Sequence, residues 1–301
     1  MKNAVAILIP VFNGLKYTQQ CVRDIYESLA RIPAENPPFS TVVIDDGSSD
    51  GTAEWIKNNY PQIHLLRGDG SLWWSGSINK GIEYALNTLH TSHILLWNND
   101  ISPDPDFFGV VLETIKNQEN FPLACSMVYF KDRPDMLIST GGYFNRRNGA
   151  LGLYNYNKKE SDASLENLKI DWFGGMGTLI RADIFESVGF FDAVGFPQYH
   201  GDSDFGVRAT GAGYSIHLVR GMKIWNDTGN SGIHRSMKLR DFVHSFTSIK
   251  SNYNIHKDLL FYGKHTASCW AYSSLVKKYA IYLASFLKWK SLAFFGIHKK
   301  N

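Results

Sequence analysis

Short apolar runs alternate with helix-like segments through the first hundred residues, and this alternation limits the fold more than any other feature of the sequence. The runs have the length and apolar content of strands covered on both faces, and they occupy residues 5–9, 41–44, 63–66 and 93–97. Strands and helices joined by short links form parallel sheets with right-handed crossovers. The sequence therefore predicts an α/β fold with a mostly parallel sheet flanked by helices.

The pattern changes after residue 106. We expect a helix to about residue 119, a strand over 123–130, and hairpins or loops over the glycine-rich, aromatic stretch 140–152. Residues 172–180 are strand-like, with small residues where a backbone or ligand can approach closely. Helices are expected from near Asp202, over 244–253 and over 274–295.

Composition narrows the class of protein. Hydrophobic residues make up 44% and charged residues 20%, which is typical of a globular chain. The formal net charge of +3 gives no basic field for nucleic acid. The three cysteines are far apart and lack metal-ligand spacing, so we expect reduced thiols in the cytoplasm. No secretory leader is expected, because Pro10 interrupts the first apolar run.

Polar residues follow two of the predicted strands directly. Asp45 and Asp46 follow one, and Asn98, Asn99 and Asp100 follow another. Ligands bind at the carboxyl ends of strands in open α/β sheets, and oxygen-bearing side chains suit a hard divalent cation. The alternative is that both groups merely end a strand in a polar turn. Neither GxGxxG nor GxxxxGK[ST] is present, which disfavours a dinucleotide fold and a P-loop enzyme.

A third acidic group stands at the start of a predicted helix. Asp204 and Arg208 are four residues apart and can pair on the helix surface, which leaves Asp202 to face a cleft. Asp202 could instead serve only as a helix cap. Trp73 and Trp74 also have two possible roles: they could pack at a corner of the core, or they could form a platform on which a sugar ring stacks.

Together these blocks resemble the family 2 glycosyltransferases, which have a GT-A-type fold. The matching blocks are residues 9–13, 43–52, 98–100 and 202–208, and the resemblance covers about residues 4 to 235. It implies a catalytic domain over 1–240, with a Rossmann-like nucleotide-sugar half (1–105) and an acceptor half (106–240). A C-terminal helical extension would occupy 241–301.

The resemblance also implies roles for single residues. Asp202 would be the general base of an inverting transfer, with Asp204 as the second candidate. Asp100 would bind Mn²⁺ or Mg²⁺, which neutralises charge on the leaving nucleoside diphosphate. The nucleotide-sugar contacts would be Pro10, Phe12, Asp45, Asp46, Asn79, Asn98 and Asn99. The acceptor contacts would be Trp172, Gly175, Met176 and Asp204.

Two positions depart from the family pattern. Asn98 stands where many members carry an acid, so Asp100 would be the charged metal ligand. Asn226 stands nearest to the position where many members carry a histidine that contacts metal or phosphate. His234, eight residues further on, is the alternative.

The C-terminal stretch 274–296 mixes aromatic and aliphatic residues with lysines. Too many lysines interrupt it for a membrane span, which needs about 20 apolar residues. A basic amphipathic helix in a membrane interface fits the pattern. A helix packed on the domain and a homodimer contact are the alternatives.

The function predicted from the resemblance is sugar transfer from a nucleotide-diphosphate sugar to a saccharide or lipid-linked saccharide, in surface polysaccharide synthesis. Similar sequences include rhamnosyltransferase-like members, so a dTDP-sugar is one candidate donor. The enzyme would act in the cytoplasm, at the inner face of the membrane if the C-terminal stretch binds lipid. A sugar nucleotidyltransferase is disfavoured because residues 10–15 are not a glycine-rich, basic loop. A non-catalytic carbohydrate- or nucleotide-sugar-binding protein remains the alternative from another class.

Overall fold

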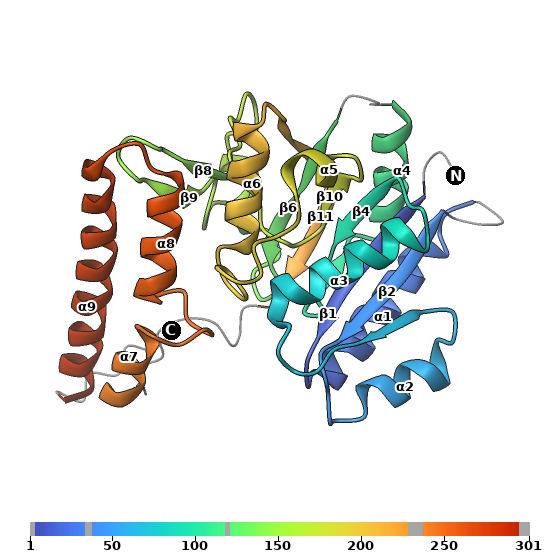
Figure 1. Cartoon of the computed structure of the whole chain (residues 1–301), viewed down its shortest axis with the longest axis horizontal. Helices are drawn as coiled ribbons and strands as arrows, with labels where there is room; N and C mark the ends of the chain where they lie inside the picture. The colour runs from blue at the N-terminus through green and yellow to red at the C-terminus, as the bar shows by residue number, and fades with distance from the viewer. Residues whose placement is uncertain (1–3, 34–37, 118–120, 228–236, 295–301) are drawn as a thin grey trace. The chain divides into compact units, whose positions relative to one another are not determined.

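The computed structural model describes residues 4–33, 38–117, 121–227 and 237–294 (Figure 1). The chain forms two compact units, the first from Met1–Tyr143 and Gly152–Thr228 and the second from Phe144–Leu151 and Gly229–Asn301. The strands are β1 (Val5–Val11), β2 (Phe39–Asp45), β3 (His64–Arg67), β4 (His93–Leu96), β5 (Ile101–Pro103), β6 (Leu123–Phe130), β7 (Leu137–Ser139), β8 (Gly142–Phe144), β9 (Leu151–Leu153), β10 (Thr178–Arg181) and β11 (Ile216–Asn226). The helices are α1 (Leu15–Leu29), α2 (Thr52–Asn59), α3 (Trp73–Asn87), α4 (Phe107–Asn117), α5 (Ile184–Val188), α6 (Gly201–Gly211), α7 (Leu239–Ser245), α8 (Ile255–His265) and α9 (Tyr272–Phe294), with 3₁₀ turns at Glu160–Asp162 and Cys269–Ala271.

The first unit is built on one large sheet. In the described part of the chain it has nine strands, in the order β3-β2-β1-β4-β10-β6-β11-β5, with β7 beside β6. β1 runs parallel to β2 and β4, and β2 runs parallel to β3. β10 enters antiparallel between β4 and β6, whereas β6 and β11 are parallel to each other. The predicted α/β fold with a central sheet flanked by helices is confirmed.

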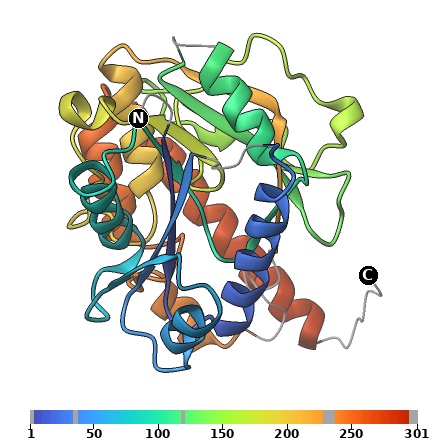
Figure 2. The same cartoon turned by 90° about the vertical axis from the view of Figure 1, so that its right-hand side faces the viewer.

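Helices cover both faces of this sheet (Figure 2). Alternate residues of β1 point to opposite sides, as strand geometry requires. Val5, Ile7 and Ile9 pack in a core cluster with residues of α1 and α4. Ala6 and Leu8 pack in a second cluster with residues of α3, α5 and α6. Burial on both faces explains why this strand reads as a continuous apolar run.

Two predicted elements are wrong in extent. The strand expected over 172–180 is reduced to Thr178–Arg181, because Gly177 has φ +64° and therefore leaves the β region just before it. Of the helix expected over 244–253, only residues 244 and 245 are helical. Instead α7 ends at Ser245, and Asn254 caps α8 by accepting a hydrogen bond from the Lys257 N–H.

The second unit consists mainly of α7, α8 and α9. Phe242 of α7 stacks on Tyr282 and Phe286 of α9, with ring centroids 4.9 and 4.1 Å apart. Asp258 of α8 is buried and accepts hydrogen bonds from two residues of α9, Lys278 and Tyr279. The predicted C-terminal helix is therefore present, with one face packed inside its own unit. Among the described residues, no helix combines the length and apolar character needed to cross a membrane.

Candidate active site

The loops after β1 and β2 are tied together at the carboxyl edge of the sheet. The Asn13 N–H donates to Ser48 Oγ at 2.9 Å, and Asn13 Oδ1 accepts from the Ser49 N–H at 2.9 Å. Pro10 is half-buried near the end of β1, whereas Phe12 is 54% exposed just beyond it. An exposed aromatic ring on a braced loop is a surface against which a base can pack.

Asp45 ends β2 as a fully buried carboxylate. Its Oδ1 accepts from the Ser48 N–H at 2.8 Å, and its Oδ2 lies 3.4 Å from Nη1 of Arg67. Arg67 ends β3, is half-exposed, and was not identified from the sequence. The structure thus supplies Asp45 with a positively charged neighbour at the predicted nucleotide site.

Asp46 shapes the loop that leads into α3. Its Oδ1 accepts from the Gly70 N–H at 2.9 Å and its Oδ2 accepts from the Trp73 N–H at 3.0 Å. A Cβ at Gly68 would lie 2.3 Å from Asp46 Oδ1, so this loop approaches the carboxylate too closely for a side chain. These contacts make Asp46 a support of the site, while its predicted contact with nucleotide stays a prediction.

The residues Asn98, Asn99 and Asp100 follow β4 and differ sharply in their partners. Asn98 Oδ1 accepts from Trp74 Nε1 at 3.0 Å. Asn99 Nδ2 donates to Thr18 Oγ1 of α1 at 3.1 Å. Asp100 Oδ1 is buried and has no hydrogen-bond partner among the described residues. The two amides hold the loop, and the carboxylate is the group left for a ligand.

A second buried oxygen belongs to the residue nearest to the family's histidine position. Asn226 Oδ1 is also buried and without a hydrogen-bond partner in the described part of the chain. Asn226 pairs with Ile101 in the β5–β11 ladder, and the Asp227 N–H donates to the Asp100 backbone oxygen at 3.1 Å. Two unpartnered oxygens are thus carried by adjacent backbone segments.

This donor set fits a hard divalent cation whose remaining ligands come from a substrate and water. Mg²⁺ is commonly bound by one or two carboxylates together with substrate phosphates. Burial, together with the nearby Asp227 carboxylate, raises the pKa of Asp100, so a cation would relieve an electrostatic cost. No group of three or more His, Cys, Asp or Glu side chains that could hold a metal occurs within the described residues. His234 lies outside those residues.

Asp202 lies in the first turn of α6 and is half-buried. Its Oδ2 accepts from the Gly175 N–H at 3.3 Å, and its Oδ1 accepts from the Ser203 N–H at 2.8 Å. Burial raises the pKa of this carboxyl group, and the hydrogen bonds from Ser203 and Gly175 oppose the shift. A carboxylate with a raised pKa is a better proton acceptor than an exposed aspartate.

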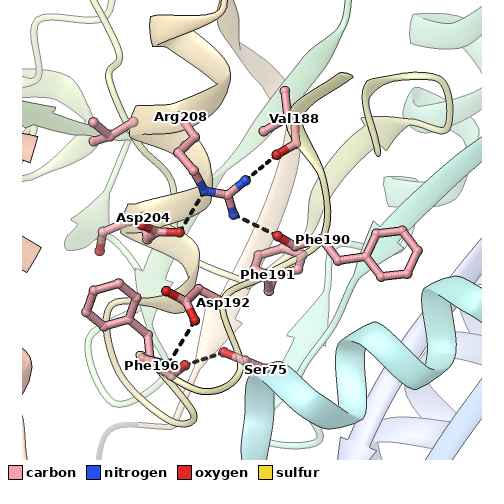
Figure 3. Close-up of polar contacts among 12 residues, drawn as sticks. Ser75, Val188, Phe190, Phe191, Asp192, Phe196, Asp204 and Arg208 are labelled. Carbon is pink, nitrogen blue, oxygen red and sulfur yellow. Dashed lines mark hydrogen bonds and ion pairs between the residues drawn. The ribbon is translucent and has the colours of Figure 1, made fainter. Parts of the chain in front are cut away.

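Asp204 is held in a structural ion pair (Figure 3). It is fully buried and its Oδ2 lies 2.8 Å from Nε of Arg208, the i,i+4 pair predicted from spacing. Arg208 also donates to the backbone oxygens of Val188 and Phe190, at 2.5 and 2.7 Å. The pair therefore fixes the segment between α5 and α6. This use of Asp204 favours Asp202 over Asp204 as the base, and an acceptor contact from Asp204 stays a prediction.

Helix α3 holds the same segment from the other side. Both atoms of the Asn79 amide bond the backbone of Phe191, at 2.8 and 3.0 Å. Ser75 Oγ donates to the Phe196 oxygen at 2.6 Å (Figure 3), and the Ser75 N–H donates to the Pro197 oxygen at 2.9 Å. Asn79 is therefore engaged in positioning the segment before α6, and its predicted nucleotide contact stays a prediction.

The three predicted acceptor residues of the 172–177 loop differ in their surroundings. Trp172 Nε1 donates to the Tyr143 oxygen at 3.1 Å, which fixes its indole on β8. Met176 is half-buried against the core cluster that contains α1 and α4. Gly175 is the one bonded directly to Asp202. Their contacts with an acceptor stay predictions.

The structure thus joins residues that are widely separated in sequence. Trp74 bonds Asn98, Trp73 bonds Asp46, and Gly175 bonds Asp202. Sequence reasoning did not identify Arg67 or the bond from Trp74, because neither follows from a local pattern.

The fold is the GT-A type that the resemblance implied. GalNAc-T7, solved with UDP, GalNAc and Mn²⁺, matches with a TM-score of 0.58 at 12% identity, over 93% of this chain and 57% of that one. S. aureus TarS 1–349, solved in complex with UDP-GlcNAc, matches with a TM-score of 0.52 at 14% identity, over 86% and 70% of the two chains. At these identities the likeness concerns the fold alone.

The chain belongs to the family described as Glycosyl transferase family 2, which matches residues 6–189. It is 25% identical over 171 residues to the low-salt glycan biosynthesis hexosyltransferase Agl10 of Haloferax volcanii. It is 28% identical over 115 residues to the dolichyl-phosphate beta-glucosyltransferase ALG5C of Trichomonas vaginalis. These matches cover 56% and 36% of this chain, and 52% and 33% of the two relatives.

Proposed function

We propose that this chain is an inverting, metal-dependent glycosyltransferase that moves a sugar from a nucleoside-diphosphate sugar to a saccharide acceptor. The observation that carries the proposal is the pair of buried oxygens of Asp100 and Asn226 at one edge of the sheet, which have no hydrogen-bond partner among the residues that the structure describes. The same edge holds Asp45. Asp202 is connected to this edge because Gly175, which bonds it, contacts the Trp74 ring that bonds Asn98. Family membership and the two neighbours solved with UDP or UDP-GlcNAc support a nucleotide-sugar donor.

Residues at the carboxyl ends of β1 and β2 would hold the nucleotide. Phe12 offers an exposed ring to the base, and Asp45 offers a carboxylate to base or ribose N–H and O–H groups. Asp100 and Asn226 would hold Mn²⁺ or Mg²⁺. When bound, the cation neutralises the charge that develops on the leaving nucleoside diphosphate.

Asp202 would act on the acceptor. Its carboxylate takes the proton from an acceptor hydroxyl while that oxygen attacks the anomeric carbon. The new C–O bond forms as the bond to the diphosphate oxygen breaks, and attack from the face opposite the leaving group inverts the anomeric centre. The hydrogen bond from Gly175 keeps the carboxylate oriented during this transfer.

The first test is thermal unfolding with UDP, GDP, dTDP and CMP, each with and without Mn²⁺. A ligand at 100 times its dissociation constant adds about 2.7 kcal/mol to the stability of the folded state. For a chain of this size that raises the melting temperature by several degrees. We expect one nucleotide to stabilise the protein only when Mn²⁺ is present. Absence of any shift in folded protein would favour a non-catalytic carbohydrate-binding protein.

We also infer that the acceptor is lipid-linked and that the second unit binds an anionic membrane surface, as at the inner face of a cell membrane. The two units differ strongly in charge. The second unit contains 14 lysines and arginines but 2 acidic residues, a formal charge of +12, which leaves −9 for the first unit within the total of +3. Basic residues near an anionic bilayer contribute about 1 kcal/mol each to binding. The name of the dolichyl-phosphate relative is consistent with a lipid acceptor.

Helix α9 carries apolar residues on its solvent-exposed face. Val276, Leu283 and Leu287 are 71%, 47% and 54% exposed and recur at intervals of seven and four residues. The helix contains four lysines and no acidic residue, so a second copy of it would be repelled by charge. An apolar stripe with flanking lysines is typical of helices that lie in a membrane interface.

Sedimentation with liposomes tests this contact. We expect Val276→Asn/Leu283→Asn/Leu287→Asn to lose most of the binding to vesicles containing anionic lipid, whereas Val194→Asn, at a 96% exposed position of the first unit, should bind normally. Substitution is preferred to truncation because removal of α9 would also remove the core residues Tyr282 and Phe286. Equal sedimentation of both variants would contradict the membrane contact. Loss of a dimer in the triple variant would assign the stripe to self-association instead.

A further inference from the structure

The first turn of α3 contacts three parts of the candidate site through three consecutive residues. The Trp73 N–H donates to Asp46, and Trp74 Nε1 donates to Asn98. Ser75 bonds the segment that precedes α6 through its hydroxyl and its N–H. This turn therefore connects the nucleotide side, the Asp100 loop and the segment that leads into α6, the helix that carries Asp202.

Trp73 begins this turn in a conformation that bulky residues rarely adopt. Its φ is +56°, in the left-handed region. Such a conformation persists only where the surrounding contacts determine it, and the hydrogen bond to Asp46 is one of them. The next residue, Trp74, forms the hydrogen bond to Asn98.

The indole of Trp74 also lies directly on Gly175. A Cβ added to Gly175 would lie 2.1 Å from Cζ2 and 2.7 Å from Cη2 of Trp74. Gly175 in turn bonds Asp202 at 3.3 Å. Trp74 thus touches the residue that orients the base and the residue that precedes the metal ligand by two positions.

We propose that Trp74 is a positioning residue that sets the separation between Asp202 and the Asn98–Asp100 loop. This inference rests on the proposed function, in which the sugar's anomeric carbon reacts between the base and the cation. A misplacement of about 1 Å can cost about 10²-fold in rate, even when binding is intact. Of the two roles that the sequence left open for Trp74, its contacts with Asn98 and Gly175 show packing, and a sugar platform stays a prediction.

Two adjacent glycines provide a matched test. Gly175→Ala must displace the Trp74 ring, whereas a Cβ at Gly174 would meet only Cε of the flexible Met176 side chain, at 3.2 Å. We expect Gly175→Ala to lower kcat by about 10²-fold, with KM for the donor changed less than about threefold. Gly174→Ala should stay within about threefold of the wild-type kcat.

A smaller ring at position 74 separates positioning from general stability. Trp74→Phe loses the N–H to Asn98 but leaves more room above Gly175, so we expect Gly175→Ala to cost less than about tenfold in the Trp74→Phe background. The Trp74 ring contacts Gly175, and Gly175 bonds the Asp202 carboxylate. The pH dependence of kcat should therefore change in Trp74→Phe. Melting temperatures and Mn²⁺-dependent nucleotide binding, measured on all variants, verify that each is folded.

The outcomes are distinct. A wild-type chain that transfers no sugar from any donor removes the proposed function and this inference with it. An active wild type in which Gly175→Ala and Gly174→Ala behave alike, or in which Gly175→Ala has the same effect in both backgrounds at position 74, overturns the positioning role alone.

Discussion

Asp202→Asn is expected to lower kcat for sugar transfer by about 10²- to 10⁴-fold, the range contributed by a general base. Asparagine has nearly the same shape and keeps one oxygen that can accept from the Gly175 or Ser203 N–H. It cannot take a proton from the acceptor hydroxyl. Nucleotide binding with Mn²⁺ and the melting temperature should therefore remain close to those of the wild type. Steady-state kinetics and calorimetric binding provide the two measurements.

The pH profile adds a second readout to this prediction. Burial raises the pKa of Asp202, and a base must be ionised to act. Activity should therefore decline as the pH falls through that raised pKa, beginning at a higher pH than for an exposed aspartate. Glu186→Gln, an exposed acid of α5, is the control and should keep the wild-type rate and profile. Near-full transfer by Asp202→Asn would show that the base is another residue, with Asp204 the next candidate.

Asp100→Ala is expected to abolish the Mn²⁺-dependent stabilisation by nucleotide while leaving the unliganded protein as stable as the wild type, within about 1 kcal/mol. Asp100 Oδ1 has no hydrogen-bond partner within the described residues, and burial raises the pKa of this carboxyl group, so removing the side chain costs the unliganded protein little. Loss of the charged ligand should remove the cation and the diphosphate together. Thermal unfolding with and without nucleotide and Mn²⁺ measures both effects.

Two further variants serve as comparisons for Asp100→Ala. Asn226→Ala should weaken Mn²⁺-dependent binding less than Asp100→Ala does, because it removes a neutral ligand. Asp106→Ala removes a carboxylate that is 79% exposed and should bind nucleotide normally. Because the ligand must be deprotonated, Mn²⁺ affinity should fall as the pH is lowered toward the raised pKa of Asp100. If Asp100→Ala bound nucleotide with Mn²⁺ as tightly as the wild type, Asp100 would not be a metal ligand and would only form part of a turn.

Several features of the site were predictable because they depend on local patterns. The alternation of apolar runs and helices determines that β1, β2 and β4 are parallel, and parallel strands place their carboxyl ends at one edge. Asp45 and Asp100 therefore come to the same edge without any knowledge of the tertiary contacts. The pairing of Asp204 with Arg208 follows in the same way from the helical repeat.

Local patterns did not predict where the strand expected over 172–180 begins, or the second unit's helix boundaries. At Gly177 a positive φ interrupts an apolar segment, and at Asn254 a side-chain cap starts a helix. Propensity alone does not distinguish these residues from others of their type. The Gly177 N–H bonds the distant Leu96 oxygen, and Asn254 is held by the irregular segment before it, through the Thr247 and Ser248 oxygens.

The sequence by itself determined the class of fold and the family, and it predicted the carboxylates of the candidate site. Only the tertiary structure decided what those carboxylates contact. Asn226 comes beside Asp100 through a strand pairing across more than a hundred residues, and Trp74 meets Asn98 and Gly175 because α3 packs against both. Such contacts depend on how elements pack rather than on spacing along the chain. Packing gives Asp46, Asn79 and Asp204 supporting contacts, and Asp100 and Asp202 are the carboxylates for which we propose the chemistry.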